Sequence, residues 1–335
     1  MIVNRTLVIA GLAIIHAVAS AAPGADESFS KLATRYLDGI ADRSPVAATA
    51  LGDHRADDRL DAVDAAARAR IRDTFLDYRE TLAGINRDEL SRANQVDAAI
   101  LHNEIESTLF DLDTLEEWAW NPLYYVRLSG NAIYGLLSRD FAPLDERLDN
   151  AASRLEQLPR FFTQARGSLQ PERVPKIHAE TAVRQNRGLE SIIDAMIVPQ
   201  LAELPPETRE RLEAAIETAR TAIAGQQAWL EDELLPRANG DFRIGAELYD
   251  RKLAFALNSS LTRREIRTLA EREYELVRSE MYEIAKQVYV GINPYTAFPD
   301  NPDEAYKQAI IRAALEVAYQ ELPPRDGIVD IARQY

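Results

Sequence analysis

The sequence contains no cysteine and only 14 glycines among its 335 residues. The absence of cysteine excludes disulfide bonds and thiol chemistry. So few glycines argue against the glycine-rich loops that hold phosphate groups. Neither a thiol enzyme nor a nucleotide-binding protein of the phosphate-loop type is therefore expected.

Basic residues are also in deficit, with 39 Lys and Arg against 54 Asp and Glu, for a net charge of −15. No basic block is longer than two residues. Nucleic acids and anionic membranes would be repelled by such a chain, which excludes both as main partners. With 46% hydrophobic residues the composition is that of a soluble globular protein.

The N-terminus has the pattern of a secretory signal peptide. Arg5 precedes an apolar stretch from Leu7 to Val18, and the small residues of Ala19–Ala21 follow. We expect residues 1–21 to be removed, and the mature chain, from residue 22 to 335, to be exported to the periplasm or the medium. Without a cysteine to carry lipid, we expect no stable membrane anchor after cleavage. An uncleaved anchor is the alternative.

Amphipathic helices account for nearly all of the mature sequence, and no stretch alternates with the period of a strand. The clearest helix runs from Pro206 to Pro236 with apolar residues at steps of three and four. Thr262 and Glu265 form a capping box that opens another long helix. Further helices are expected over about 175–203 and 303–321. The fold class is therefore all-α: one large bundle of long antiparallel helices spanning 22–335.

Three stretches have the composition of loops, and the end of the chain is abrupt. The loops are expected at 128–143, 237–245 and 291–302. After "ELPP" the apolar residues Ile328, Val329 and Ile331 resemble the start of another buried element. We expect the fold to be incomplete at the C-terminus.

Familiar catalytic motifs are missing. There is no H-E-x-x-H pair and no G-x-S-x-G elbow. His102 and Glu106 share a helix face but supply only two ligands, and His178 and Glu180 diverge around their helix. No catalytic residue and no metal ligand is assigned.

The stretch "GDHRADDRL" at 52–60 gathers one histidine among three aspartates and two arginines. Asp53, His54, Asp57 and Asp58 form a conceivable metal cluster, but their spacing fits neither a calcium loop nor a zinc pattern. A polar turn between helices, held by local salt bridges, is the favoured interpretation.

Aromatic residues gather in "EEWAWNPLYYVRL" at 116–128, where Pro122 interrupts a helix. Trp118, Trp120, Tyr124 and Tyr125 have polar tips, and such residues at a helix break line ligand clefts or fill the junction between helices. Both alternatives stay open from the sequence.

The order of four segments resembles one bacterial family. They are "ALGDHRADDRLDAV" at 50–63, "NPLYYV" at 121–126, "DFRIGAELYDRKLAFAL" at 241–257 and "LTRREIRTLAEREYELVRSEMYEIA" at 261–285. Together they are similar to the bacterial domain-of-unknown-function family 885 (DUF 885). The resemblance implies the architecture of large helical metallopeptidases, whose zinc-type H-E-x-x-P-G-H segment lies in a C-terminal half.

This chain resembles the N-terminal half only, so the resemblance implies no cofactor here and zinc only where a longer C-terminal half exists. It implies one wall of a substrate cleft, with Asp53, His54, Tyr124, Tyr125 and Arg127 as the substrate-binding candidates. The expected function is the N-terminal part of an exported zinc-dependent peptidase-like hydrolase, inactive alone. The alternative is a non-catalytic periplasmic helical protein that binds a peptide or another ligand. The sequence indicates no oligomeric state.

Overall fold

The computed structural model describes residues 23–320 and 322–334, and it divides into two compact units at Asn258 and Ser259. The predicted leader, residues 1–21, lies outside the described residues. The described residues form helices and turns with no β-strand, which confirms the all-α fold class. The boundary at 258/259 was not predicted, since the sequence shows no linker composition there.

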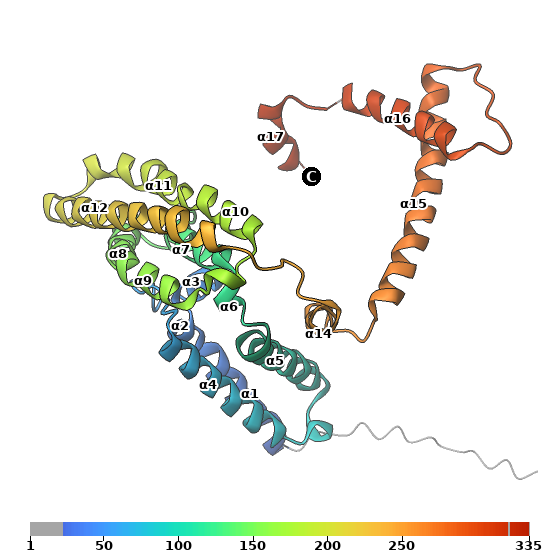
Figure 1. Ribbon diagram of the computed structural model, residues 1–335. Helices are drawn as coiled ribbons and strands as arrows, with labels where there is room; N and C mark the ends of the chain where they lie inside the picture. Colours follow the sequence, from blue (N-terminus) through green and yellow to red (C-terminus); the bar gives the residue numbers. More distant parts are fainter. Residues whose placement is uncertain (1–22, 321, 335) are drawn as a thin grey trace, which may run out of the picture. The chain divides into compact units, whose positions relative to one another are not determined.

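The N-terminal unit contains fourteen described α-helical segments, which Figure 1 shows in sequence colours. They are α1 (Pro23–Asp38), α2 (Ile40–Arg43), α3 (Pro45–Leu51), α4 (Ala65–Ala83), α5 (Arg92–Phe110), α6 (Glu117–Trp120), α7 (Pro122–Leu137), α8 (Leu144–Glu156), α9 (Leu158–Ser168), α10 (Lys176–Asn186), α11 (Gly188–Ile192), α12 (Pro206–Trp229), α13 (Leu235–Arg237) and α14 (Ala246–Leu257).

Two hydrophobic cores hold this unit together. The larger lies among α7 to α12 and includes Leu148, Phe161 and Ile223, all of which are buried. The smaller lies among α1, α4 and α5, where Phe75 and Ile105 are buried. Figure 1 shows the corresponding two groups of helices, joined through α2, α3 and α6. Burial of such side chains stabilises the fold by about 1.5–3 kcal/mol each.

The predicted stripe on α12 is confirmed, because Leu212, Ile216, Ala219 and Ile223 are all buried. Its predicted end at Pro236 lies one residue before Arg237, where the continuous helical path ends. The helix passes into a π-helical turn at Leu230–Leu234, and Pro236 lies in the first turn of α13, where a proline has no N–H to lose.

Two other predicted segments differ from the structure. The single helix expected over 175–203 is a series of short elements: α10, α11, a π-helical turn at Ile193–Ile197 and a 3₁₀-helix at Val198–Glu203. The loop expected at 128–143 is helical as far as Leu137, because α7 continues through Gly130 and Gly135. Packing overrides the weak helix propensity of those glycines.

The C-terminal unit contains α15 (Arg263–Ile292), α16 (Glu304–Gln320) and α17 (Ile328–Ala332). The predicted capping box at Thr262 and Glu265 is present. A small core of Tyr282, Ala285, Ile310, Ile311 and Ala314 joins α15 to α16.

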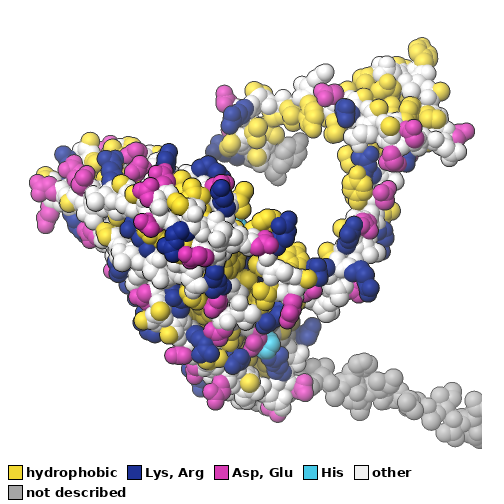
Figure 2. All heavy atoms as spheres, viewed as in Figure 1, with side chains coloured by type: hydrophobic (Ala, Val, Ile, Leu, Met, Phe, Trp, Pro, Cys, Tyr) yellow, Lys and Arg dark blue, Asp and Glu magenta, His cyan; other side chains and the backbone are white. Residues whose placement is uncertain are grey.

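Much of the apolar surface of α15 is exposed in this unit. Leu269, Val277 and Ile284 are exposed, whereas Tyr282 and Ala285 on another face are buried. Figure 2 shows hydrophobic side chains gathered on the surface where α15 meets α16.

Candidate functional site

A break in the helical path between α5 and α7 builds the candidate site. Helix α5 ends at Phe110 and passes into a π-helical turn at Asp111–Leu115. Glu116 then adopts a left-handed conformation with φ of 50° and ψ of 44°. A π-turn and a left-handed residue with a side chain are both uncommon, and both occur often at functional sites.

The two tryptophans that follow satisfy carbonyl groups released by this turn. The Nε1 of Trp118 donates to the Leu112 carbonyl at 3.1 Å, and the Nε1 of Trp120 donates to the Leu115 carbonyl at 2.9 Å. Asn121 then caps α7 by accepting a hydrogen bond from the Leu123 N–H. The polar tips of the aromatic residues are therefore used to stabilise the irregular backbone.

Helices α7 and α4 position two further residues beside Trp118, namely Tyr125 and Arg68. The Tyr125 hydroxyl donates to the Trp118 carbonyl at 2.6 Å, and Tyr125 is buried. Burial raises the pKa of Tyr125 to about 12. The guanidinium carbon of Arg68 lies 3.9 Å from the centroid of the Trp118 ring, while its Nη1 donates to the Val63 carbonyl and to Ser168 Oγ, each at 2.7 Å.

These residues surround a cavity of about 250 Å³ within the N-terminal unit. Its lining combines apolar and aromatic groups with three charged side chains, and it comes from the 60–64 segment, α4, α5, the π-turn, α6 and α7. The lining residues are Ala62, Val63, Arg68, Ile71, Thr108, Asp111, Leu112, Glu117, Trp118, Tyr124 and Tyr125. We call this cavity the helix-break cleft.

Two carboxylates line the helix-break cleft, and they differ in the partners that they contact. The Glu117 carboxylate accepts a hydrogen bond from Asn121 Nδ2 at 2.6 Å and lies 3.7 Å from Lys252 Nζ on α14. The Asp111 carboxylate accepts no hydrogen bond from any described residue. Burial raises the pKa of Asp111; Lys252 lowers it in part, while Glu117 and Glu104 raise it further. Asp111 is therefore a poorly compensated acid in an aromatic cleft.

The predicted candidates Tyr124 and Tyr125 meet at this cleft, with ring centroids 5.0 Å apart in an edge-to-face arrangement. The pKa of Tyr124 is raised, chiefly by burial. Arg127 lies two residues further along α7 and is exposed, outside the cleft lining. The structure thus brings two of the five candidates together.

The other two candidates, Asp53 and His54, lie in the polar turn after α3. Asp53 pairs with Arg55 at 2.7 Å, and the Arg55 guanidinium lowers the pKa of Asp53 to about 2. His54 Nδ1 lies 2.8 Å from Asp57 Oδ2, and its ring stacks on Phe141 with centroids 3.7 Å apart. Neither residue lines the helix-break cleft. Their role in substrate binding stays a prediction.

The same turn connects to a buried cation that the sequence did not reveal. Arg154 on α8 is fully buried, and its Nη2 donates to Thr49 Oγ1 at 2.6 Å and lies 3.7 Å from Asp57 Oδ1. The Thr49 hydroxyl also contacts Asp57 Oδ1 at 2.5 Å. Nε and Nη1 of Arg154 donate to the carbonyls of Arg59 and Ala132. This confirms the interpretation of "GDHRADDRL" as a polar turn held by salt bridges.

Asp61 extends this network into α3. Its carboxylate accepts hydrogen bonds from Ser44 Oγ at 2.5 Å and from the Val46 N–H at 3.0 Å. Burial raises the pKa of Asp61, although these bonds and Arg154 act in the opposite direction. The turn is therefore a structural clamp between α3 and α8.

Sequence reasoning missed Arg68, Asp111 and Glu117 as cleft residues. Arg68 lies far from the aromatic segment in the chain, and only the packing of α4 against it brings the guanidinium to Trp118. Asp111 and Glu117 looked like ordinary members of an acidic run. The only available signal was their position in the acidic stretch just before the break predicted at Pro122.

The other two histidines that the structure describes, His102 and His178, do not form a site. His102 is exposed, and although it shares a helix face with Glu106, no hydrogen bond joins the two side chains. His178 is half-buried and stacks on Trp120 with centroids 5.9 Å apart. Burial lowers the pKa of His178. Among the described residues no cluster of three or more His, Asp or Glu side chains is arranged to bind a metal.

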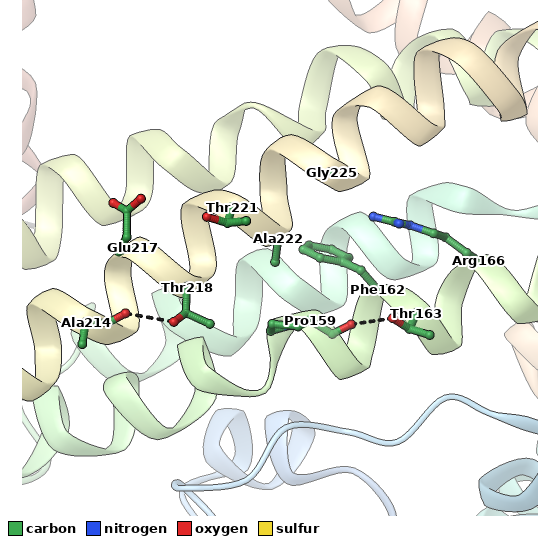
Figure 3. Close-up of a pocket in the computed structure, with 10 residues that line it drawn as sticks. All are labelled: Pro159, Phe162, Thr163, Arg166, Ala214, Glu217, Thr218, Thr221, Ala222 and Gly225. Atoms are coloured by element: carbon green, nitrogen blue, oxygen red, sulfur yellow. Dashed lines mark hydrogen bonds between the residues drawn. The ribbon is translucent and has the colours of Figure 1, made fainter.

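A second, larger depression lies between α9 and α12, with a volume of about 640 Å³ (Figure 3). Thr163 and Thr218 line it, but their hydroxyls donate to carbonyls of their own helices, as Figure 3 shows. Arg166 at its end donates to Gln226 Oε1 at 2.8 Å. Thr163, Thr218 and Arg166 are thus already bonded, and the other polar side chains of the lining, Glu217 and Thr221, are exposed. The smaller helix-break cleft is therefore the better candidate despite its volume.

Comparison with known proteins shows to which family the chain belongs. Residues 45–327 match the family described as bacterial protein of unknown function (DUF885). This chain belongs to the DUF885 family. No curated protein matches it.

A solved structure supports the fold assignment. The chain is 25% identical to a candidate lipoprotein of unknown function from Shewanella oneidensis, with a TM-score of 0.74. The match covers 91% of this chain and 55% of that one, so this DUF885 chain spans about half the length of its structural neighbour. No helix in the described part of the chain has the length and hydropathy needed to cross a membrane.

Proposed function

We propose that this DUF885 chain is the ligand-recognition part of an exported peptidase-like hydrolase and that it binds its ligand at the helix-break cleft. The observation that carries the proposal is the cleft, where Trp118, Tyr124 and a poorly compensated Asp111 line one cavity. Apolar walls with a few polar groups are typical of small-ligand sites.

The zinc ion implied by the resemblance does not fit the described residues, among which no three-ligand cluster exists. Zinc hydrolysis needs several ligands together with a base. We therefore derive no hydrolytic step from this chain, and we propose that it is inactive alone. The half-length match to the Shewanella oneidensis structure is consistent with this proposal, because that protein has room for a further set of groups.

Export is part of the same proposal. The apolar segment between Leu7 and Val18 has the pattern of a leader. The Shewanella oneidensis protein is described as a candidate lipoprotein, which is a class of exported protein. Both observations support a periplasmic or extracellular location.

The alternative function is a periplasmic binding protein without catalysis, and the same cleft supports it. The native mass distinguishes the two. A species near 37.5 kDa, less the leader, in a periplasmic extract supports the binding protein. A much heavier species that contains these peptides supports the hydrolase.

Purified protein provides the test of inactivity. We expect it to bind short peptides and to leave them intact. Hydrolysis by the purified chain that stops on addition of a chelator would overturn the proposal that it is inactive alone.

A further inference from the structure

The charged groups of the helix-break cleft are not equally satisfied. Arg68 donates through Nη1 to two oxygen atoms and lies against the face of Trp118. Glu117 has Asn121 and Lys252 as partners. Asp111 has no hydrogen-bond donor among the described residues, although it is half-buried. No ion pair joins Arg68 to either carboxylate within that part of the chain. The cleft therefore presents a carboxylate that accepts no hydrogen bond and that Lys252 compensates only in part.

The groups around Asp111 suit a small cation with several donors. Tyr124 provides aromatic surface, which attracts cations by its electron-rich face, whereas one face of Trp118 is already covered by Arg68. The Tyr124 hydroxyl forms no hydrogen bond with the described residues and is free to accept one. A primary ammonium has three N–H donors, enough for Asp111, Tyr124 and Glu117.

The size of the cleft limits the ligand. A volume of about 250 Å³ lies below the usual range for a drug-sized ligand of about 300–1,000 Å³. It therefore accepts the end of a chain or one side chain, and not a folded segment.

Resting on the proposed function, we propose that the helix-break cleft binds a primary ammonium group of a peptide, with Asp111 as its counter-ion and Trp118 and Tyr124 against the neighbouring carbons. The ammonium belongs either to the peptide N-terminus or to a lysine side chain, since both have the same chemistry.

The test is calorimetric titration of the purified full chain with three peptides: Phe-Gly-Gly, N-acetyl-Phe-Gly-Gly and N-acetyl-Lys-Gly-Gly. We expect at least one amine-bearing peptide to bind ten or more times as tightly as the acetylated phenylalanine peptide. Preference for Phe-Gly-Gly identifies an N-terminus, and preference for the lysine peptide identifies a side chain.

The Asp111→Asn substitution should weaken binding of the preferred amine-bearing peptide at least tenfold. The matched control is Asp113→Asn, which should leave that affinity unchanged. Asp113 lies on the same π-turn but pairs with Arg72 at 2.9 Å and does not line the cleft. A thermal melt checks that both variants are folded. The comparison of free and acetylated peptides uses the wild-type chain, so it tests the proposal even where a variant does not fold.

The outcomes separate this inference from the proposed function. Equal binding of all three peptides, unchanged in Asp111→Asn, overturns the ammonium site and leaves peptide recognition intact. Failure of every peptide to bind overturns peptide recognition itself.

Discussion

Arg154 and Asp57 lie 97 positions apart in the sequence, yet Arg154 Nη2 is 3.7 Å from Asp57 Oδ1 and both side chains are buried. Burial lowers the pKa of Arg154 to about 10, while Asp57 and Asp61 act to raise it. A buried cation with a paired carboxylate tolerates loss of that partner badly, because the remaining charge has no compensation.

Asp57→Ala is therefore expected to lower the free energy of unfolding by about 3–5 kcal/mol. Asp58→Ala, at the adjacent exposed position, is the control and should change it by less than about 0.5 kcal/mol. Urea denaturation followed by circular dichroism measures both. Equal losses in the two variants would show that the turn, and not the buried pair, holds α3 to α8.

Glu116 provides a second prediction, because its left-handed backbone costs a residue with a side chain about 1–2 kcal/mol. Glu116→Gly should relieve that strain, but it also removes the ion pair with Arg173 at 2.7 Å. The substitution is therefore made in an Arg173→Gln background. We expect stability to rise there by about 0.5–1 kcal/mol, after allowance for the flexibility of glycine. An unchanged or lower stability in that background would contradict the claim that the backbone at Glu116 is strained.

Asp111 makes a pH-dependent contribution to stability whose sign follows from its raised pKa. Burial raises the folded-state pKa of Asp111 above its ordinary value of 3.8, with Lys252 opposing and Glu117 and Glu104 adding to the shift. Protonation is therefore easier in the folded state. The contribution of Asp111 to stability is fully present below pH 3.8 and is lost as the pH rises through the folded-state pKa.

Asp111→Asn should accordingly stabilise the protein at pH 7.5, by up to about 1 kcal/mol after discounting for partial exposure. The gain should shrink as the pH is lowered to 4. Denaturation curves at both pH values, with Asp113→Asn as the control, test this. A variant less stable than the wild type at pH 7.5 would mean that the Asp111 carboxylate stabilises the fold. It would contradict the view that this carboxylate is poorly compensated and kept for a ligand.

Ammonium binding should show the opposite dependence on pH. Only the ionised Asp111 carboxylate compensates a cation, so the affinity for an amine-bearing peptide should fall as the pH decreases toward the raised pKa. Calorimetric titrations from pH 7.5 down to pH 4, close to the ordinary carboxyl pKa of 3.8, measure this loss. Affinity that is constant over this range would place the ammonium elsewhere.

Local patterns carried the sequence-based prediction of the fold, and long-range contacts limited it. The stripe of Leu212, Ile216 and Ile223 on α12 and the capping box at Thr262 depend on neighbours within one or two turns, and both are confirmed. The end of α12 and the π-turn at Asp111–Leu115 depend on what packs around them, for example the indole donors of Trp118 and Trp120. Such partners carry no periodic signal.

The candidate site could likewise be predicted from the sequence only where its features are local. The aromatic residues at the Pro122 break pointed to the right place, because polar-tipped aromatics at an interruption are a local feature. The clamp at 52–60 was recognised as polar, but its partner Arg154 was not, since nothing near position 154 distinguishes a buried arginine from an exposed one. Arg68 is hidden for the same reason.

The most direct test of the central claim is to follow the indole N–H signals of the ¹⁵N-labelled protein by NMR during titration with the tightest-binding peptide. The chain has three tryptophans, and substitution of each by Phe assigns the three signals. Trp118 lines the helix-break cleft, whereas Trp229 packs on the large core at the end of α12. The account predicts that the Trp118 signal shifts with peptide concentration and that the Trp229 signal does not. Saturable binding that shifts Trp229 and leaves Trp118 unchanged would contradict it.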